Sequence, residues 1–314
     1  MAHPKLQLAA ALVGSGLAGV LVALQSRING GLSQQLGNGF VAAAISFGGG
    51  LVVMLLVLLV SRRGRQGIGL VRREIAAGRL PRWALLGGAG GAFLVLNQGL
   101  ITPLIGVALF TVGIVAGQVS GGLVLDRLGL GPGGRIRATP TRLVGAALAI
   151  VAVVVTVAGA LDSSLALLVL VPVIVGAGVA AQSMVNGLVR AAAQSAVTAT
   201  LTNFIVGTAL LVLAAVVSLL FTGWPTHWPS ELWLYSGGLI GVVFIAVAAM
   251  LVRRAGVLLL SMSNVAGQLV AAIAFEIGFP LAGGLTPALV AGTLIALVAV
   301  VIAAVPSKPV AGRE

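Results

Sequence analysis

Residues 24–38, LQSRINGGLSQQLGN, place Gln25, Arg27 and Asn29 directly after a long apolar run. Residues 181–194, AQSMVNGLVRAAAQ, repeat the spacing Gln-x-x-x-Asn far downstream. Residues four apart share one face of a helix, so each copy presents its two carboxamides together. This duplication predicts that the fold consists of two related halves, because a polar pair that ends an apolar helix occurs once in each half of the chain.

The composition is typical of an integral membrane protein. Hydrophobic residues make up 59% of the chain, charged residues make up 8%, and the mean hydropathy is +1.18. These values lie far outside ordinary globular usage. Apolar runs recur near the length that crosses a hydrocarbon core of ~30 Å, and they do not alternate as barrel strands do. The sequence therefore predicts an all-α integral membrane protein.

Several classes of function are disfavoured by the charged and reactive residues. The net charge of +12 lies in short loops between apolar runs, where basic residues set topology, so nucleic acid is not an expected partner. The chain has no cysteine, and its two histidines, His3 and His227, lie far apart. We expect no catalytic cluster, no metal and no cofactor, and the glycine-rich residues 129–134 lack the Lys-Ser/Thr of a P-loop. We therefore expect a protein that is not an enzyme.

Apolar runs and the breakers between them predict ten transmembrane helices. The predicted ranges are 6–30, 39–60, 83–99, 104–126, 141–161, 164–190, 197–221, 232–251, 256–278 and 286–305. The first run is interpreted as a retained span rather than a signal peptide, because it exceeds the usual apolar region of such peptides. Residues 61–82 form the longest predicted polar connection.

The distribution of basic residues predicts the orientation of these helices. If the N-terminus is cytoplasmic, all 18 lysines and arginines except Arg27 lie on the cytoplasmic side. Such a bias is the signature of the positive-inside rule. We expect a multi-pass protein of the cytoplasmic (inner) membrane with both termini in the cytoplasm.

An internal repeat divides the chain into residues 1–161 and 162–314. A shift of 157 residues aligns Gln25 with Gln182 and Asn29 with Asn186, and a shift of 150 then aligns Asp126 with Glu276. The second shift also superposes the Ala-Gly-Gln triplets at residues 116–118 and 266–268, and the tryptophans Trp83 and Trp233. Each repeat contains five predicted spans, and an odd number turns the second copy upside down in the membrane. Inverted repeats of this kind are a construction of secondary transporters.

The repeated motifs carry a resemblance to a known family. They read QSRIN, SFGGG and AGQVSGGLVLDRLG in the first half, and QSMVN, NFIVG and AGQLVAAIAFEIG in the second. In these motifs the chain resembles the YdcZ-like family of the drug/metabolite transporter superfamily, as a fused tandem of two five-helix units. The resemblance implies the drug/metabolite transporter fold and the export of a small solute, and it implies no particular substrate. The second copy departs from the pattern because no basic residue or glycine-rich loop follows its acid.

The paired carboxamides have two interpretations. Gln25, Asn29, Gln182 and Asn186 either form hydrogen bonds between helices or line a translocation path at the repeat interface. Both readings stay open at this point, and one residue can serve both roles in different states.

Gln118 and Gln268 are the strongest candidates for binding substrate. Each lies near the middle of a predicted span and follows a glycine, which allows close approach of a neighbouring backbone. A carboxamide both donates and accepts hydrogen bonds, so it suits neutral, zwitterionic or hydrogen-bonding solutes.

Three charged residues at the predicted membrane edges are candidates for coupling or gating. Asp126 and Glu276 either relay protons or make structural contacts at helix ends, and the adjacent Arg127 is the expected partner of Asp126. Arg27 either reaches the outer interface or meets an anionic group that enters from outside. Its counterpart, Met184, is neutral, so this feature belongs to one copy only.

The sequence as a whole favours a secondary transporter that exports a small polar or amphiphilic metabolite by alternating access. The alternative is a flippase for a lipid or a lipid-linked metabolite, and a membrane enzyme or scaffold is a third reading. Expected partners are a small-molecule substrate and membrane lipids, and both a monomer and a homodimer stay open.

Overall fold

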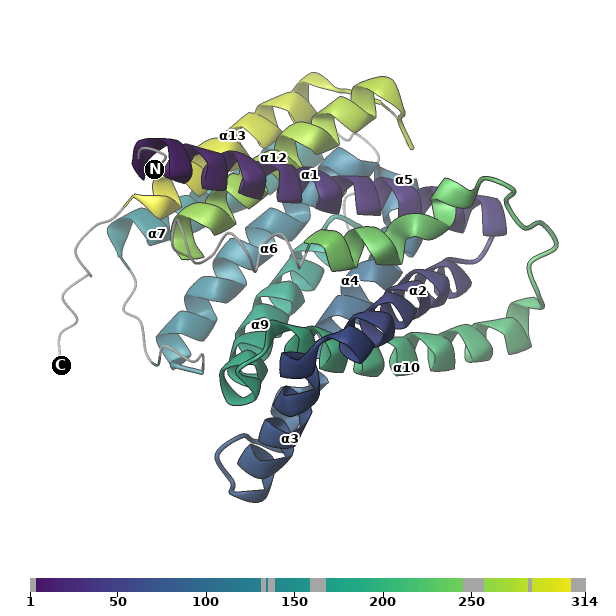
Figure 1. The fold of residues 1–314 in the computed structure, drawn as a ribbon. Helices are drawn as coiled ribbons and strands as arrows, with labels where there is room; N and C mark the ends of the chain where they lie inside the picture. Colours follow the sequence, from purple (N-terminus) through teal and green to yellow (C-terminus); the bar gives the residue numbers. More distant parts are fainter. Residues whose placement is uncertain are drawn as a thin grey trace.

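A computed structural model describes residues 4–130, 134, 139–158, 168–244, 257–281 and 284–305. These residues form helices and contain no strand. The elements, of which Figure 1 labels the α-helices, are α1 (Pro4–Leu36), α2 (Gly39–Val60), α3 (Arg62–Ala76), η1 (Arg82–Gly87), α4 (Gly88–Leu100), α5 (Thr102–Ile105), α6 (Val107–Leu128), α7 (Pro140–Ala158), α9 (Leu170–Ala193), α10 (Ala196–Thr222), η2 (Leu232–Ser236), α12 (Val257–Gly278) and α13 (Pro287–Ala304).

Within the described residues, five helices are long and apolar enough to cross a membrane, namely α2, α6, α7, α9 and α10. Shorter apolar helices cover residues 232–244, Asn264–Gly278 and Pro287–Ala303. Large apolar side chains such as Val60, Leu220 and Phe221 are more than three-quarters exposed on α2 and α10. Exposed apolar surface on long helices suits contact with hydrocarbon, so the structure agrees with a helical membrane protein.

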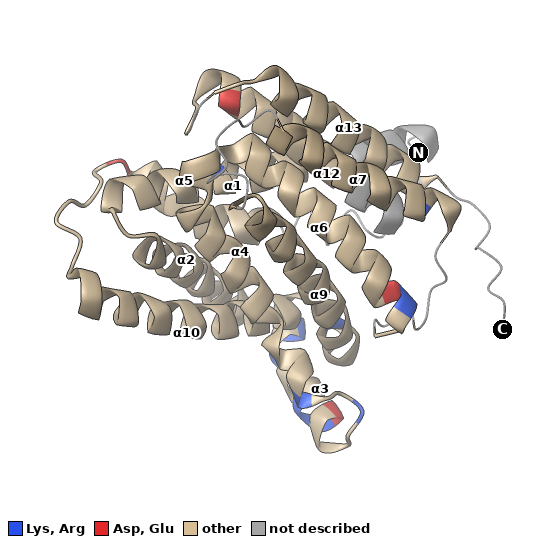
Figure 2. Ribbon diagram, turned by 180° about the vertical axis from the view of Figure 1, so that it is seen from behind, with Lys and Arg blue, Asp and Glu red and all other residues tan. Residues whose placement is uncertain are grey.

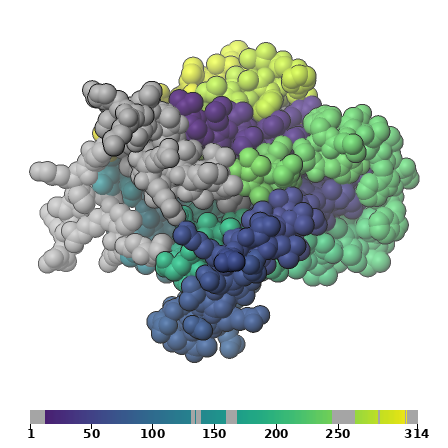
Figure 3. Space-filling view, in the orientation of Figure 1, coloured from purple at the N-terminus to yellow at the C-terminus, as the bar shows by residue number. Residues whose placement is uncertain are grey.

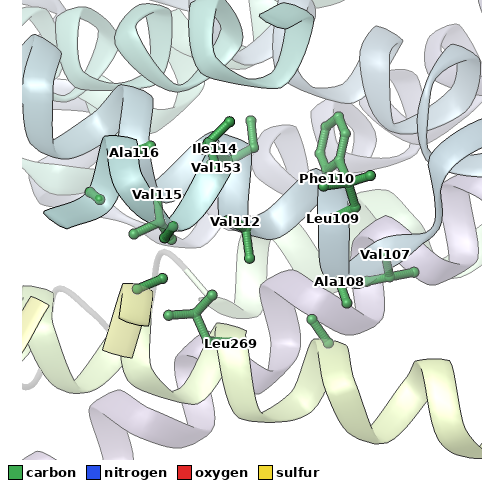
Figure 4. Packing of buried hydrophobic residues seen from close by; sticks show 14 of the residues in the cluster. Val107, Ala108, Leu109, Phe110, Val112, Ile114, Val115, Ala116, Val153 and Leu269 are labelled. Atoms are coloured by element: carbon green, nitrogen blue, oxygen red, sulfur yellow. The ribbon is translucent and has the colours of Figure 1, made fainter. Parts of the chain in front are cut away.

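The core is built around α6. Residues 107–117 of this helix are all buried, and they pack against α7, α9, α12 and α13. Figure 4 shows Val107, Ala108, Val112 and Val115 of α6 on the side that faces Leu269 of α12. The centre of the protein is therefore a contact between helices from the two halves of the sequence.

Glycines bring the helices of the two halves into backbone contact. A Cβ atom on Gly117 of α6 would overlap the carbonyl group of Val173 on α9. A Cβ atom on Gly267 of α12 would overlap the carbonyl group of Gly16 on α1 in the same way. Such close approach is typical of small residues between membrane helices.

These two contacts are equivalent under the shifts found in the sequence, since residue 173 is 16 + 157 and residue 267 is 117 + 150. A second pair of contacts is equivalent in the same way. Gly176 lies against the Ile114 carbonyl, and Gly19 lies against the Asn264 carbonyl. The bounds of α6 and α12 also differ by 150 residues at both ends. Residues that align in the sequence thus make matching contacts in space.

One connection differs from its prediction. Residues 61–82 were expected to be a polar connection, but most of them form the helix α3. Ser61 caps this helix, because its Oγ accepts a hydrogen bond from Gly64 N at 3.0 Å. Six of the basic residues behind the orientation lie outside the described residues: Arg135, Arg137, Arg253, Arg254, Lys308 and Arg313.

Gly117→Ala tests the backbone contact between α6 and α9. The added methyl group must push the helices apart, and we expect a loss of ~1–3 kcal/mol in the free energy of unfolding. Gly122→Ala is the matched control on the same helix, because a Cβ atom there meets open space. Thermal unfolding of purified protein, followed by circular dichroism, measures both. Equal melting temperatures for the two variants would contradict the contact.

Candidate functional site

A small cavity lies between helices from both halves of the chain. Its volume is about 20 Å³, which is room for one or two water molecules. The cavity is lined by Val22, Ala23 and Ser26 of α1, Leu94 and Gln98 of α4, Phe110, Thr111, Ile114 and Gln118 of α6, and Gln268 of α12. The two strongest sequence candidates, Gln118 and Gln268, therefore lie at the same cavity.

The two glutamines differ in their hydrogen bonds. The Gln268 side chain is buried, and its Nε2 donates to Asn264 Oδ1 at 2.7 Å, one turn earlier on α12. Gln118 is partly exposed, and no hydrogen bond joins its side chain to any described residue. Gln118 thus keeps its full donor and acceptor capacity for a molecule in the cavity.

A buried hydrogen-bonded chain forms another wall of the cavity. Gln98 has no exposed surface, and its Nε2 donates to Ser26 Oγ at 2.8 Å. Its Oε1 accepts a hydrogen bond from Asn29 Nδ2 at 2.7 Å. Ser26 Oγ in turn donates to the Val22 carbonyl at 3.2 Å. Sequence reasoning missed Gln98, although the triplet Asn-Gln-Gly at residues 97–99 interrupts an apolar run and could have indicated it.

The first carboxamide pair joins α1 to the start of the helix that follows η2. Gln25 Nε2 donates to the Gly237 carbonyl at 2.9 Å, and both Gln25 and Asn29 are buried. Asn29 Oδ1 is buried without a hydrogen-bond partner and lies against the Gly237 backbone. In this structure the pair connects helices, and only Asn29 reaches the cavity wall, through Gln98.

The second pair occupies matching places with different bonding. Asn186 Oδ1 lies against Gly87, since a Cβ atom added to Gly87 would be 2.8 Å from this oxygen. Asn29 Oδ1 lies against Gly237 in the same way. Gln182 lies against Gly91 in the same way. Both side chains are partly exposed, and within the described part of the chain neither makes a hydrogen bond. The two copies therefore share contacts but differ in burial and hydrogen bonding.

Glu276 and Arg27 lie together at one end of the bundle. The buried Glu276 carboxylate accepts a hydrogen bond from Val107 N at 3.1 Å, at the first residue of α6. A negative charge is favourable there because the helix dipole is positive at its N-terminus. Arg27 Nε donates to the Phe279 carbonyl at 2.9 Å, and its guanidinium interacts electrostatically with Glu276.

Asp126 lies at the opposite end of α6 from the Glu276 contact. Its Oδ2 accepts a hydrogen bond from Arg142 Nη1 of α7 at 2.9 Å, and both side chains are partly exposed. The expectation that Arg127 would be its partner was wrong, because adjacent residues on a helix do not face each other. Among the residues that the structure describes, no group of three or more His, Cys, Asp and Glu side chains could hold a metal ion.

Gln98→Leu tests whether the buried chain holds α4 to α1. The substitution leaves Asn29 Nδ2 without its partner and removes one of the two hydrogen bonds of Ser26 Oγ, so we expect ~1–3 kcal/mol less free energy of unfolding. Gln118→Leu is the matched control, because it removes a side chain without such bonds. Chemical or thermal unfolding in detergent compares the two. An equal loss in both variants would show that the chain has no special role in stability.

The chain was compared with known proteins. The model of the family DMT_YdcZ, described as "Putative inner membrane exporter, YdcZ", matches residues 10–155 and 167–305. The two segments together cover most of the sequence. No curated protein matches the chain.

Proposed function

The chain belongs to the YdcZ family of inner membrane exporters, and from this membership we propose that it is a secondary transporter that exports a small polar or amphiphilic solute by alternating access. The observation that carries the proposal is the group of polar side chains that line the cavity between helices of both halves. Carboxamides and hydroxyls gather there inside a protein whose other buried surfaces are largely apolar. Transporters built from repeats place their solute sites at such an interface.

The proposed architecture is ten membrane spans in two inverted repeats, with both termini in the cytoplasm. The matching contacts of Gly117 with Val173 and of Gly267 with Gly16 support the repeat. The repeat is also supported by α6 and α12, whose first and last residues each differ by 150 in number. The inversion itself follows from an odd number of spans in each copy, and the cytoplasmic termini follow from the positions of Lys and Arg.

Differences between equivalent residues support a protein caught in one of two states. At the end of α1, Gln25 is bonded to Gly237, and Glu276 is bonded to the first residue of α6. At the end of α9, their counterparts Gln182 and Asp126 lack the equivalent bonds. The end of α1 is thus held by hydrogen bonds that the end of α9 lacks, and the end of α9 is held by apolar packing against η1 and α3.

The second state follows by exchanging the roles of the two halves. Gln182 Nε2 would then donate to the Gly87 carbonyl. Asp126 would leave Arg142 and accept from the backbone N–H of Val257, which begins α12 as Val107 begins α6. Glu276 would be released at the same time. In this scheme Asp126 and Glu276 are gating residues, and the predicted orientation makes the hydrogen-bonded end of α1 the periplasmic end.

The lining of the cavity favours an uncharged or zwitterionic solute. Its polar groups are three carboxamides and two hydroxyls, and none of the lining residues is ionisable. Burying an unpaired ion is costly, whereas a hydrogen-bonding neutral group can be satisfied by Gln118, Gln268 and Thr111. A proton or solute gradient would act through the acids at the helix ends rather than in the cavity.

Gln118→Ala and Gln268→Ala test the assignment of the site. Each is expected to reduce transport about tenfold, the effect of one hydrogen bond of ~1.4 kcal/mol, while the yield of folded protein is unchanged. Liposomes with a pH gradient and a panel of amines, amino acids and organic acids provide the measurement. Gln35→Ala is the control, because Gln35 is exposed at the end of α1.

Three outcomes would count against parts of the proposal. Wild-type rates in both variants would remove the two glutamines from the site. Loss of folded protein in both would assign them to helix packing instead. A protein that moves lipid analogues but no solute in the panel would be the flippase.

A further inference from the structure

The helix α3 has no counterpart in the second half of the chain. The repeat shift falls from 157 to 150 across the connection that contains it. The corresponding residues 223–231, between α10 and η2, form no helix. A transport mechanism that rests on the duplicated helices therefore does not account for α3.

The apolar side of α3 is already covered by the protein. Thr198 Oγ1 of α10 donates to the Gly64 carbonyl at 2.9 Å, and Gly67 lies against the same threonine. Val71 packs in a cluster with Val185 and Val189 of α9. Since this side is occupied, α3 does not need to bury it in the membrane, and its opposite side is the one left for a partner.

That opposite side is basic. Arg62, Arg63, Arg72 and Arg73 are exposed, and none of them forms an ion pair with a described residue. Figure 2 shows the Lys and Arg residues gathered on α3, and Figure 3 shows this helix projecting from the body of the molecule. We call these four residues the α3 arginine face.

The other charges of the α3 segment are already paired. Arg65 donates to the Leu58 and Leu59 carbonyls at the end of α2. Glu74, the one acid of α3, accepts two hydrogen bonds from Arg79 at 2.7 Å each. These bonds lower the pKa of Glu74, so this carboxylate stays ionised and paired. It is therefore not available to neutralise the arginine face.

The place of α3 puts this face at the membrane surface. The apolar helix α2 ends at Val60, and α3 begins at Arg62, one residue later. Two arginines in the first turn also lie at the positive end of the helix dipole, and no acid is present in that turn. An anion bound there would relieve this local repulsion, and a helix that follows a membrane-spanning helix after one residue lies within reach of the bilayer headgroups.

We propose that the α3 arginine face binds the headgroups of anionic phospholipids of the surrounding membrane. Guanidinium groups form paired hydrogen bonds with phosphate oxygens, and basic segments next to a membrane are attracted to acidic lipids. The attachment of α3 to the ends of α9 and α10 fixes the site beside the membrane-spanning bundle.

Lipid binding to the full-length protein in a neutral detergent tests the proposal. Phosphatidylglycerol and phosphatidylcholine with identical acyl chains are titrated separately, and bound lipids are counted by native mass spectrometry. We expect about 600-fold tighter binding of phosphatidylglycerol, from four fivefold steps of one arginine each. A four-Gln variant should lose this preference, at about fivefold for each arginine removed. It carries Arg62→Gln, Arg63→Gln, Arg72→Gln and Arg73→Gln. A variant with Lys at the same four positions keeps the positive charge and should retain most of the preference for phosphatidylglycerol.

Three results would overturn the proposal. They are equal binding of the two lipids by the wild type, an unchanged preference in the four-Gln variant, and displacement of phosphatidylglycerol by equimolar glycerol phosphate. The last result would mean a site for a soluble anion. If the four-Gln variant does not fold, Arg72→Gln, Arg73→Gln carries the test with an expected loss of about 25-fold, from two fivefold steps. Circular dichroism and gel filtration establish that each variant is folded.

Discussion

A carboxamide inside a hydrocarbon layer must find a hydrogen-bond partner. The hydrogen bonds that the buried carboxamides make determine which helices are joined here. Asn29, Gln98 and Ser26 satisfy one another and fix α1 to α4. Gln25 satisfies its amide on the Gly237 carbonyl. Gln118 has no such partner among the described residues and lines the cavity, so we propose it as the residue that meets a solute.

The glycine contacts explain how two halves can share one cavity. Carbonyl groups packed directly on Gly117 and Gly267 allow α6 with α9, and α12 with α1, to lie closer than side chains would permit. These contacts are alike in both halves, whereas the hydrogen bonds of Gln25 and Gln182 differ. A rigid set of matching contacts with unequal bonds at the two ends is what an alternating-access protein requires.

Much of this arrangement could be predicted from the sequence. The shifts of 157 and 150 anticipated the matching contacts, and Gln118 and Gln268 were selected for their depth and their preceding glycines. The Asp126 partner could not be found from neighbouring letters, because Arg142 comes from another helix. Gln98 escaped a search for duplicated polar residues, since its aligned position is Ala248. The helix α3 was obscured by three glycines and many arginines, and its stability comes from packing on α9 and α10.

In the proposed mechanism, the two ends of the bundle open alternately. The chain has no cysteine, so spin labels can be placed at Gln34 and Leu232 near one end, and at their counterparts Ala191 and Arg82 near the other. All four residues are exposed. Double electron–electron resonance in lipid bilayers, with and without a transported solute gradient, measures both distances. Alternating access predicts that one distance grows as the other shrinks. Distances that stay fixed, or that grow together, would contradict it.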